Sequence, residues 1–108
     1  MAIYELKYMF DWGSGTCVWA NNEASKKLFA NYPVSIEQLP ISKVLKDELN
    51  QLIEEYDKAL DWDCPSNDLL WSEDRQKQFI SEAISAYKRL CLELGMEYHV
   101  ERNDNWIL

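Results

Sequence analysis

The run FDWGSGTCVW at residues 10–19 contains two glycines, a serine and an aspartate, which are residue types that can bind phosphate or a metal ion. A phosphate-binding loop leads directly into a helix, whose N-terminus supplies amide donors and a favourable dipole. Here Gly13, Ser14 and Gly15 lead into TCVW, which is rich in β-forming residues, and no Walker or GxGxxG pattern is present. The run therefore predicts a hairpin turn rather than a phosphate site.

Residues for nucleophilic or metal chemistry are few. The chain has one histidine, His99, and three widely spaced cysteines, Cys17, Cys64 and Cys91. A serine nucleophile at Ser14 needs a base, and His99 falls on the polar side of its expected strand. Structural zinc usually takes paired ligands at short spacing. We therefore expect reduced thiols, no metal, no cofactor and no catalytic residue.

Length and composition indicate one globular domain covering residues 1–108, with 47% apolar residues to form a core. No apolar run approaches the roughly 20 residues that a membrane-spanning helix needs. The first residues also lack the basic and apolar regions of a signal peptide, and widely spaced cysteines suit a reducing compartment. We expect a cytoplasmic protein that does not bind membranes.

The net charge of −8 is concentrated in one segment. Residues 48–74 contain nine acidic residues and one base, Lys58, whereas the rest of the chain balances ten acids with ten bases. Nucleic-acid binding requires clustered cations, which this composition lacks. Concentrated negative charge instead steers a basic partner toward a protein. We thus expect a basic protein partner and no direct contact with nucleic acid.

Alternating hydrophobicity predicts the strands. Residues 4–12 alternate between apolar and polar positions, and residues 16–20 form a short stretch of β-forming residues, so the two indicate an N-terminal hairpin. Residues 96–101 alternate in the same way and predict a third, C-terminal strand. The tail 103–108 is expected to fray unless Trp106 docks on the core.

Helical spacing of apolar residues predicts a short helix over 23–30 and two long helices, which begin after Ser42 and Ser72. The long helices are expected to end near Leu60 and at Leu94, before Gly95. The element order is then β-β-α-α-α-β. This order favours an α+β fold of two layers, in which the two long helices pack on a small antiparallel sheet made of the hairpin and the C-terminal strand. The order of the strands is left open.

Three strings carry a family resemblance: MFDWGSGTCVWANNEA at 9–24, YPVSIEQLPIS at 32–42, and LIEEYDKALDW at 52–62, which is followed by a proline and LLWSED. From about Tyr8 to Leu94 the chain resembles small bacterial cytosolic proteins, some of them encoded beside polymorphic or contact-dependent toxins. Such proteins act as immunity proteins, each binding one cognate toxin and blocking its active site. The resemblance implies no set of site residues, because immunity families diverge with their toxins.

The acidic segment is the candidate interface. Trp and Tyr supply hot spots in protein–protein interfaces, and charge sets association rate and partner choice. In the alternative interpretation, Trp62 and Trp71 anchor the inter-helix loop to the core and the acids keep the protein soluble; both interpretations can hold together. The residues expected to bind the partner are Glu54, Asp57, Asp61, Trp62, Asp63, Asp68, Trp71 and Glu73.

These inferences together predict a non-enzymatic immunity protein. Its acidic surface would cover the basic active site of a cognate bacterial toxin, and the charge favours a nuclease as that toxin. The alternative is a small enzyme or ligand-binding domain with a pocket between hairpin and helices, near Asp11, Trp12 and Trp19. The chemistry of the toxin and the oligomeric state are left open.

Overall fold

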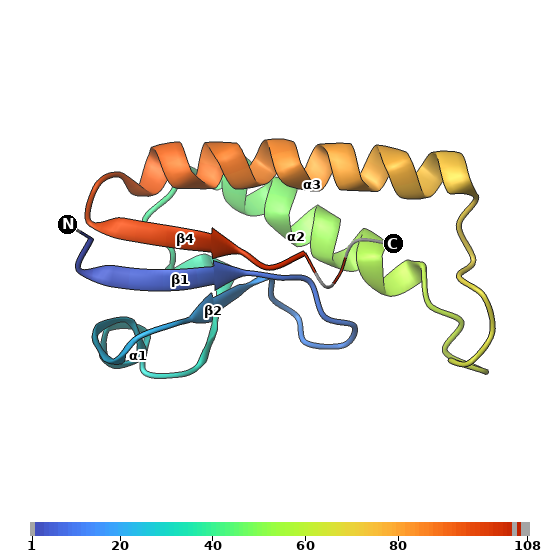
Figure 1. The fold of residues 1–108 in the computed structure, drawn as a ribbon, viewed down its shortest axis with the longest axis horizontal. Coiled ribbons are helices and arrows are strands. Elements are labelled where there is room, and N and C mark those ends of the chain that lie inside the picture. The colour runs from blue at the N-terminus through green and yellow to red at the C-terminus, as the bar shows by residue number, and fades with distance from the viewer. Residues whose placement is uncertain (1, 105, 107–108) are drawn as a thin grey trace.

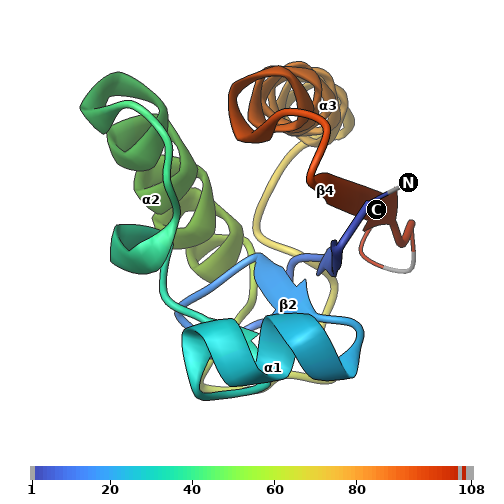
Figure 2. The ribbon, with the colours of Figure 1, turned by 90° about the vertical axis from the view of Figure 1, so that its left-hand side faces the viewer.

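The computed structural model describes residues 2–104 and 106, which form a four-stranded sheet and three α-helices. The two long helices lie above one face of the sheet, whereas the short helix lies beside the hairpin strands, away from α3 (Figures 1 and 2). The elements are β1 (Tyr4–Tyr8), β2 (Val18–Ala20), α1 (Glu23–Phe29), β3 (Pro33–Val34), the 3-10 turn η1 (Ile36–Gln38), α2 (Lys43–Lys58), α3 (Glu73–Leu94) and β4 (Tyr98–Arg102). The two-layer α+β fold is as predicted. The predicted order also holds, with β3 and η1 added.

The strand order is β3-β2-β1-β4, and the sheet is mixed. β1 pairs with β2 in the antiparallel sense, as the hairpin predicted, with Leu6 opposite Ala20. β4 pairs with β1 in the parallel sense, with Leu6 opposite Val100. The expectation of a wholly antiparallel sheet was therefore wrong. Alternating hydrophobicity has the same period in both directions, so it cannot give the direction of a strand that returns after a long helix.

The loop of the hairpin is longer than predicted. β1 ends at Tyr8 and β2 begins at Val18, so most of FDWGSGTCVW lies in the connection. Gly13 and Gly15 both have positive φ, of 78° and 72°, which glycine adopts without steric strain. The stretch is thus a turn that leads into a strand, as predicted.

The long helices begin and end close to the predicted residues. The Oγ atoms of Ser42 and Ser72 accept hydrogen bonds from the third residue of each helix, at 3.2 Å in both cases. α3 ends at Leu94, before Gly95, whose φ is 82°. These caps are determined by short-range sequence, which explains why they were predicted.

The core fills the space between the sheet and the two long helices. Its largest fully buried side chains include Leu6 and Tyr8 from β1, Leu45 and Leu49 from α2, and Phe79 from α3. The Tyr8 hydroxyl donates a buried hydrogen bond of 2.8 Å to the Ala83 carbonyl oxygen of α3. Among the described residues, no helix is both long enough and apolar enough to cross a membrane.

The C-terminal segment also contributes to this core. Trp106 is 2% exposed, and its ring lies 5.1 Å from that of Phe10 and 6.1 Å from that of Phe79, measured between centroids. The sequence left open whether the tail frays or Trp106 docks on the core, and the structure shows that Trp106 docks. Residues 105, 107 and 108 lie outside the described residues.

Candidate functional site

Six carboxylates gather at one end of the molecule. They lie in the last turn of α2, in the loop 59–72 and in the first turn of α3, and Figure 1 places these segments together at one end of the long axis. None of the ion pairs formed within residues 2–104 and 106 involves any of the six. We call this group the acidic end: Asp57, Asp61, Asp63, Asp68, Glu73 and Asp74.

Two hydrogen bonds hold the turn of the hairpin against the acidic end, and a third fixes Trp62 beside it. The Gly13 amide donates to Asp57 Oδ1 at 3.0 Å, and Trp12 Nε1 donates to the Tyr56 carbonyl oxygen at 2.9 Å. Trp62 Nε1 donates to the Asp57 carbonyl oxygen at 2.7 Å. The ring of Trp12 also stacks on that of Tyr56, with centroids 4.8 Å apart. The turn therefore helps to position α2's last residues and Trp62.

Asp61 organises the loop after α2. Its Oδ1 accepts the amides of Asp63 and Cys64 at 3.1 and 3.3 Å, and its Oδ2 accepts from the Asn67 side chain at 3.1 Å. The hydrogen bond from Asn67, followed by that from the Cys64 amide, holds the pKa of the Asp61 carboxyl below its usual value. Asp61 is thus a positioning residue within the acidic end.

The two tryptophans of the segment have different environments. Trp62 is 55% exposed, with its indole nitrogen already bonded to the backbone. Trp71 is half-buried; its ring lies 5.1 Å from that of Phe79, and the Arg75 guanidinium lies 4.6 Å from its centroid. Trp71 therefore anchors the loop to the core, while Trp62 presents its ring to solvent. Leu70, which the sequence reading did not select, is 64% exposed in the same loop.

The other acidic residues of α2 are neutralised. Glu48 pairs with Arg89, and Glu55 pairs with Arg75 at 3.2 Å. Glu54, a predicted binding residue, lies 3.8 Å from Lys58. Counting charges along the sequence missed Arg75 and Arg89, because both lie on the opposite helix. The uncompensated negative charge consequently covers less than the whole segment 48–74 and lies toward its C-terminal end.

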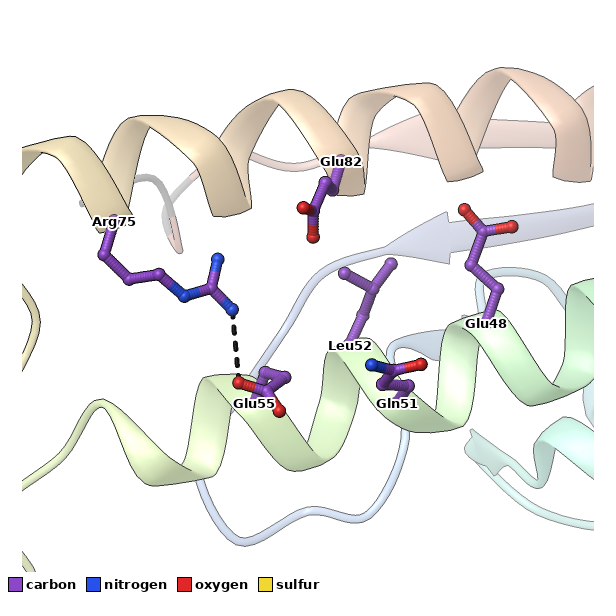
Figure 3. Close-up of a pocket in the computed structure, with 6 residues that line it drawn as sticks. All are labelled: Glu48, Gln51, Leu52, Glu55, Arg75 and Glu82. Carbon is purple, nitrogen blue, oxygen red and sulfur yellow. Dashed lines mark hydrogen bonds and ion pairs between the residues drawn. The ribbon is translucent and has the colours of Figure 1, made fainter.

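A groove of about 440 Å³ separates α2 from α3. Figure 3 shows its lining side chains, among which Glu82 points from α3 toward α2. The sequence did not predict this groove. One feature of the sequence could have indicated it: Arg75, Glu82 and Arg89 are spaced by seven residues, which places all three on one face of α3. The groove is lined by Glu48, Gln51, Leu52, Glu55, Arg75 and Glu82.

The residues of the alternative pocket prediction lie apart from the groove. Asp11 is exposed, whereas Trp19 is 8% exposed and donates from Nε1 to the Met9 carbonyl oxygen at 2.9 Å. Trp12 uses its indole nitrogen in the contact with α2 described above. A second cavity of about 350 Å³ lies between Leu28, Phe29, Gln38, Pro40 and Tyr98. Asp11, Trp12 and Trp19 line neither of these two cavities.

Cys17 and His99, which were considered for nucleophilic or metal chemistry, have different environments. Burial raises the pKa of the Cys17 thiol well above its usual value, which keeps that group protonated. His99 is exposed on β4, as its position in the alternation predicted. Within the part of the chain that the structure describes, no three His, Cys, Asp or Glu side chains are grouped to hold a metal ion.

Comparison with known families gives one match. Residues 4–105 match a family model described as Serratia CdiI immunity protein-like. No curated protein matches the chain significantly. The matched range includes the hairpin, both long helices and β4, and therefore both the acidic end and the groove.

Proposed function

Because the chain belongs to the Serratia CdiI immunity protein-like family, we propose that it is a non-enzymatic protein that binds and neutralises one cognate bacterial toxin. The proposed contact surface is the acidic end, with Trp62 as its aromatic anchor. The observation that carries this choice is a 55% exposed tryptophan beside six carboxylates that form no ion pair with the described residues. Uncompensated charge and an exposed aromatic ring together suit an interface.

The charge favours a nuclease as the toxin. A nuclease binds the phosphates of its substrate with a cationic cleft, and a cluster of carboxylates offers that cleft the same sign of charge. Binding would then exclude the nucleic acid by occlusion, and no chemical step by this chain is required. Long-range attraction between the two surfaces would also raise the association rate. The proposed compartment is the cytoplasm, where such a toxin would meet its substrate.

Trp62 is well suited to be the anchor because its orientation is fixed before binding. The bond from Nε1 to the Asp57 carbonyl oxygen holds one edge of the indole. A Cβ atom placed on Gly13 would lie 3.5 Å from the Trp62 ring, so the hairpin turn packs against the same side chain. Pre-organisation of this kind lowers the entropy lost on binding.

The test is a double charge reversal, Asp63→Lys with Asp68→Lys, assayed with the cognate toxin domain. These side chains are exposed and accept none of the hydrogen bonds formed by the described residues, unlike those of Asp57 and Asp61. Loss of one paired interface charge typically costs about 2–5 kcal/mol. We expect weaker binding by calorimetry, a smaller dependence of the association rate on salt, and loss of protection in cells that express the toxin.

The matched control is Glu37→Lys with Glu97→Lys, which makes the same change in net charge. Both residues are exposed, at the N-terminal side of α2 and just before β4, and so lie far from the loop 59–72 (Figure 1). The control should bind and protect as the wild type does. If the Asp63 and Asp68 variant protects as well as the control, the acidic end is not the interface. A wild-type chain that fails to bind the toxin would refute the proposed function itself.

A further inference from the structure

The groove between α2 and α3 has a regular arrangement of charges. On α3, Arg75, Glu82 and Arg89 are spaced by seven residues and share one face of the helix. Arg75 reaches Glu55 of α2 at one end of the groove, and Arg89 reaches Glu48 of α2 at the other. Two interhelical ion pairs thus bound the groove, and Glu82 lies between them (Figure 3).

Glu82 is the central charge of this row, and α2 offers it no cation. The residues of α2 that line the middle of the groove are Gln51 and Leu52. Glu82 Oε1 accepts a hydrogen bond of 3.1 Å from the Gln78 side chain on its own helix. Its Oε2 receives no hydrogen bond from the described residues, and Glu82 forms none of their ion pairs. The groove is therefore lined by three carboxylates and one arginine, and Arg89 lies outside this lining, where it pairs with Glu48.

We propose that the groove is a second binding site, which receives one arginine or lysine side chain of the toxin against Glu82. This inference rests on the proposed function for the identity of the partner, but its chemistry follows from the groove alone. A cation placed there would give Glu82 an ion pair, as Arg75 and Arg89 give Glu55 and Glu48. The side chain of Leu52, which is 4% exposed, would contact the aliphatic part of the incoming residue.

Charge and shape both argue for a cation rather than another ligand. An anion would meet three carboxylates, Glu48, Glu55 and Glu82. Arg75 is paired with Glu55, and its Nη1, which has no acceptor among the described residues, is buried. An apolar side chain would remove water from Glu82 Oε2, which accepts no hydrogen bond from the described residues, and this is unfavourable. The volume of about 440 Å³ falls within the range of ordinary ligand pockets, so a long basic side chain fits.

The first test needs no toxin. The full chain, labelled with ¹⁵N, is titrated with N-acetyl-arginine amide, and N-acetyl-citrulline amide serves as a neutral probe of nearly the same shape. We expect arginine to shift the amide signals of Gln51, Leu52 and Glu82, and citrulline to leave them unchanged. Glu82→Gln should weaken this binding several-fold, whereas Asp63→Asn, a matched change at the acidic end, should preserve it.

The inference would be overturned by any of three results. These are arginine shifts confined to residues 57–74, equal binding of arginine and citrulline, or no change in the titration on Glu82→Gln. Circular dichroism and thermal unfolding of Glu82→Gln verify that the fold is kept, as expected for an exposed side chain.

A second arm separates this inference from the proposed function. Loss of one partner of a charged interface pair typically weakens binding by roughly 30-fold or more, so we expect Glu82→Gln to raise the Kd for the toxin by that factor. Unchanged affinity would refute the groove as a toxin site while the acidic end could still bind. A wild-type chain without affinity for the toxin would refute the proposed function, and the arginine titration would still decide the chemistry of the groove.

Discussion

Removal of the Trp106 side chain should strongly destabilise the protein, although only two residues follow it in the sequence. The ring is 2% exposed and contacts Tyr8, Phe10 and Phe79 at centroid distances of 6.2, 5.1 and 6.1 Å. Truncation of a buried Trp to Ala costs about 3–5 kcal/mol because it creates a cavity. A domain of this size has roughly 5–15 kcal/mol of stability in total.

Replacement by Phe should be much milder. The indole nitrogen of Trp106 is buried, and no described residue accepts a hydrogen bond from it. Leaving a buried donor without an acceptor costs about 1–3 kcal/mol, so Trp106→Phe removes this penalty while it keeps most of the aromatic contacts. The gain should offset a large part of the lost volume, and we expect a net loss below about 2 kcal/mol.

Urea unfolding followed by circular dichroism measures both variants, and Tyr87→Phe is a useful control. That change removes the hydroxyl that donates to the Val100 carbonyl oxygen at 2.7 Å and should cost only about 1 kcal/mol. Trp106→Ala should lower the midpoint by several times as much, with little change in slope. A loss under about 1 kcal/mol for Trp106→Ala would show that the tryptophan does not fill the core in solution, and the reasoning would fail.

Two further predictions follow from titration and burial. Hydrogen bonds lower the pKa of Asp61 in the folded protein. The loop that Asp61 organises should therefore be fully ordered above about pH 4 and should lose this order as the pH falls through the lowered pKa. An NMR titration in which the carboxyl signal of Asp61 moves at the usual pKa would contradict this. With a disulfide thiol reagent, exposed Cys64 should react first and half-buried Cys91 more slowly. Cys17, whose pKa burial raises, should react only at the rate of unfolding; its reaction on the time scale of Cys64 would show that the hairpin opens in the native state.

The sequence predicted the features that depend on neighbouring residues. Gly13 and Gly15 indicated a turn, and Ser42 and Ser72 indicated helix starts, because caps and turns are formed by residues a few positions apart. The spacing of apolar residues also gave the faces of the long helices and the two-layer fold. Caps and turns are local, and the apolar period can be followed along the chain, so one sequence was enough to predict them.

The candidate site depended on contacts between distant residues. Counting along the chain gave eight uncompensated negative charges in residues 48–74, but Arg75 and Arg89 of α3 neutralise part of them. Likewise, composition could not distinguish Trp62 from Trp71, since only the packing on Phe79 buries the latter. Side-chain pairing between two helices is set by their relative position, which the sequence does not state.

By itself, the sequence determined the three helices, three of the four strands, their order, the hairpin turn and the location of the excess charge within the chain. Only the tertiary structure decided that β4 runs parallel to β1, that Trp106 enters the core, and that Glu82 lines a groove whose arginine pairs with Glu55 instead. The physical reason is the range, along the chain, of the interactions involved. Backbone conformation responds to residues a few positions away, whereas strand direction, charge compensation and cavities depend on which distant segments the fold places side by side.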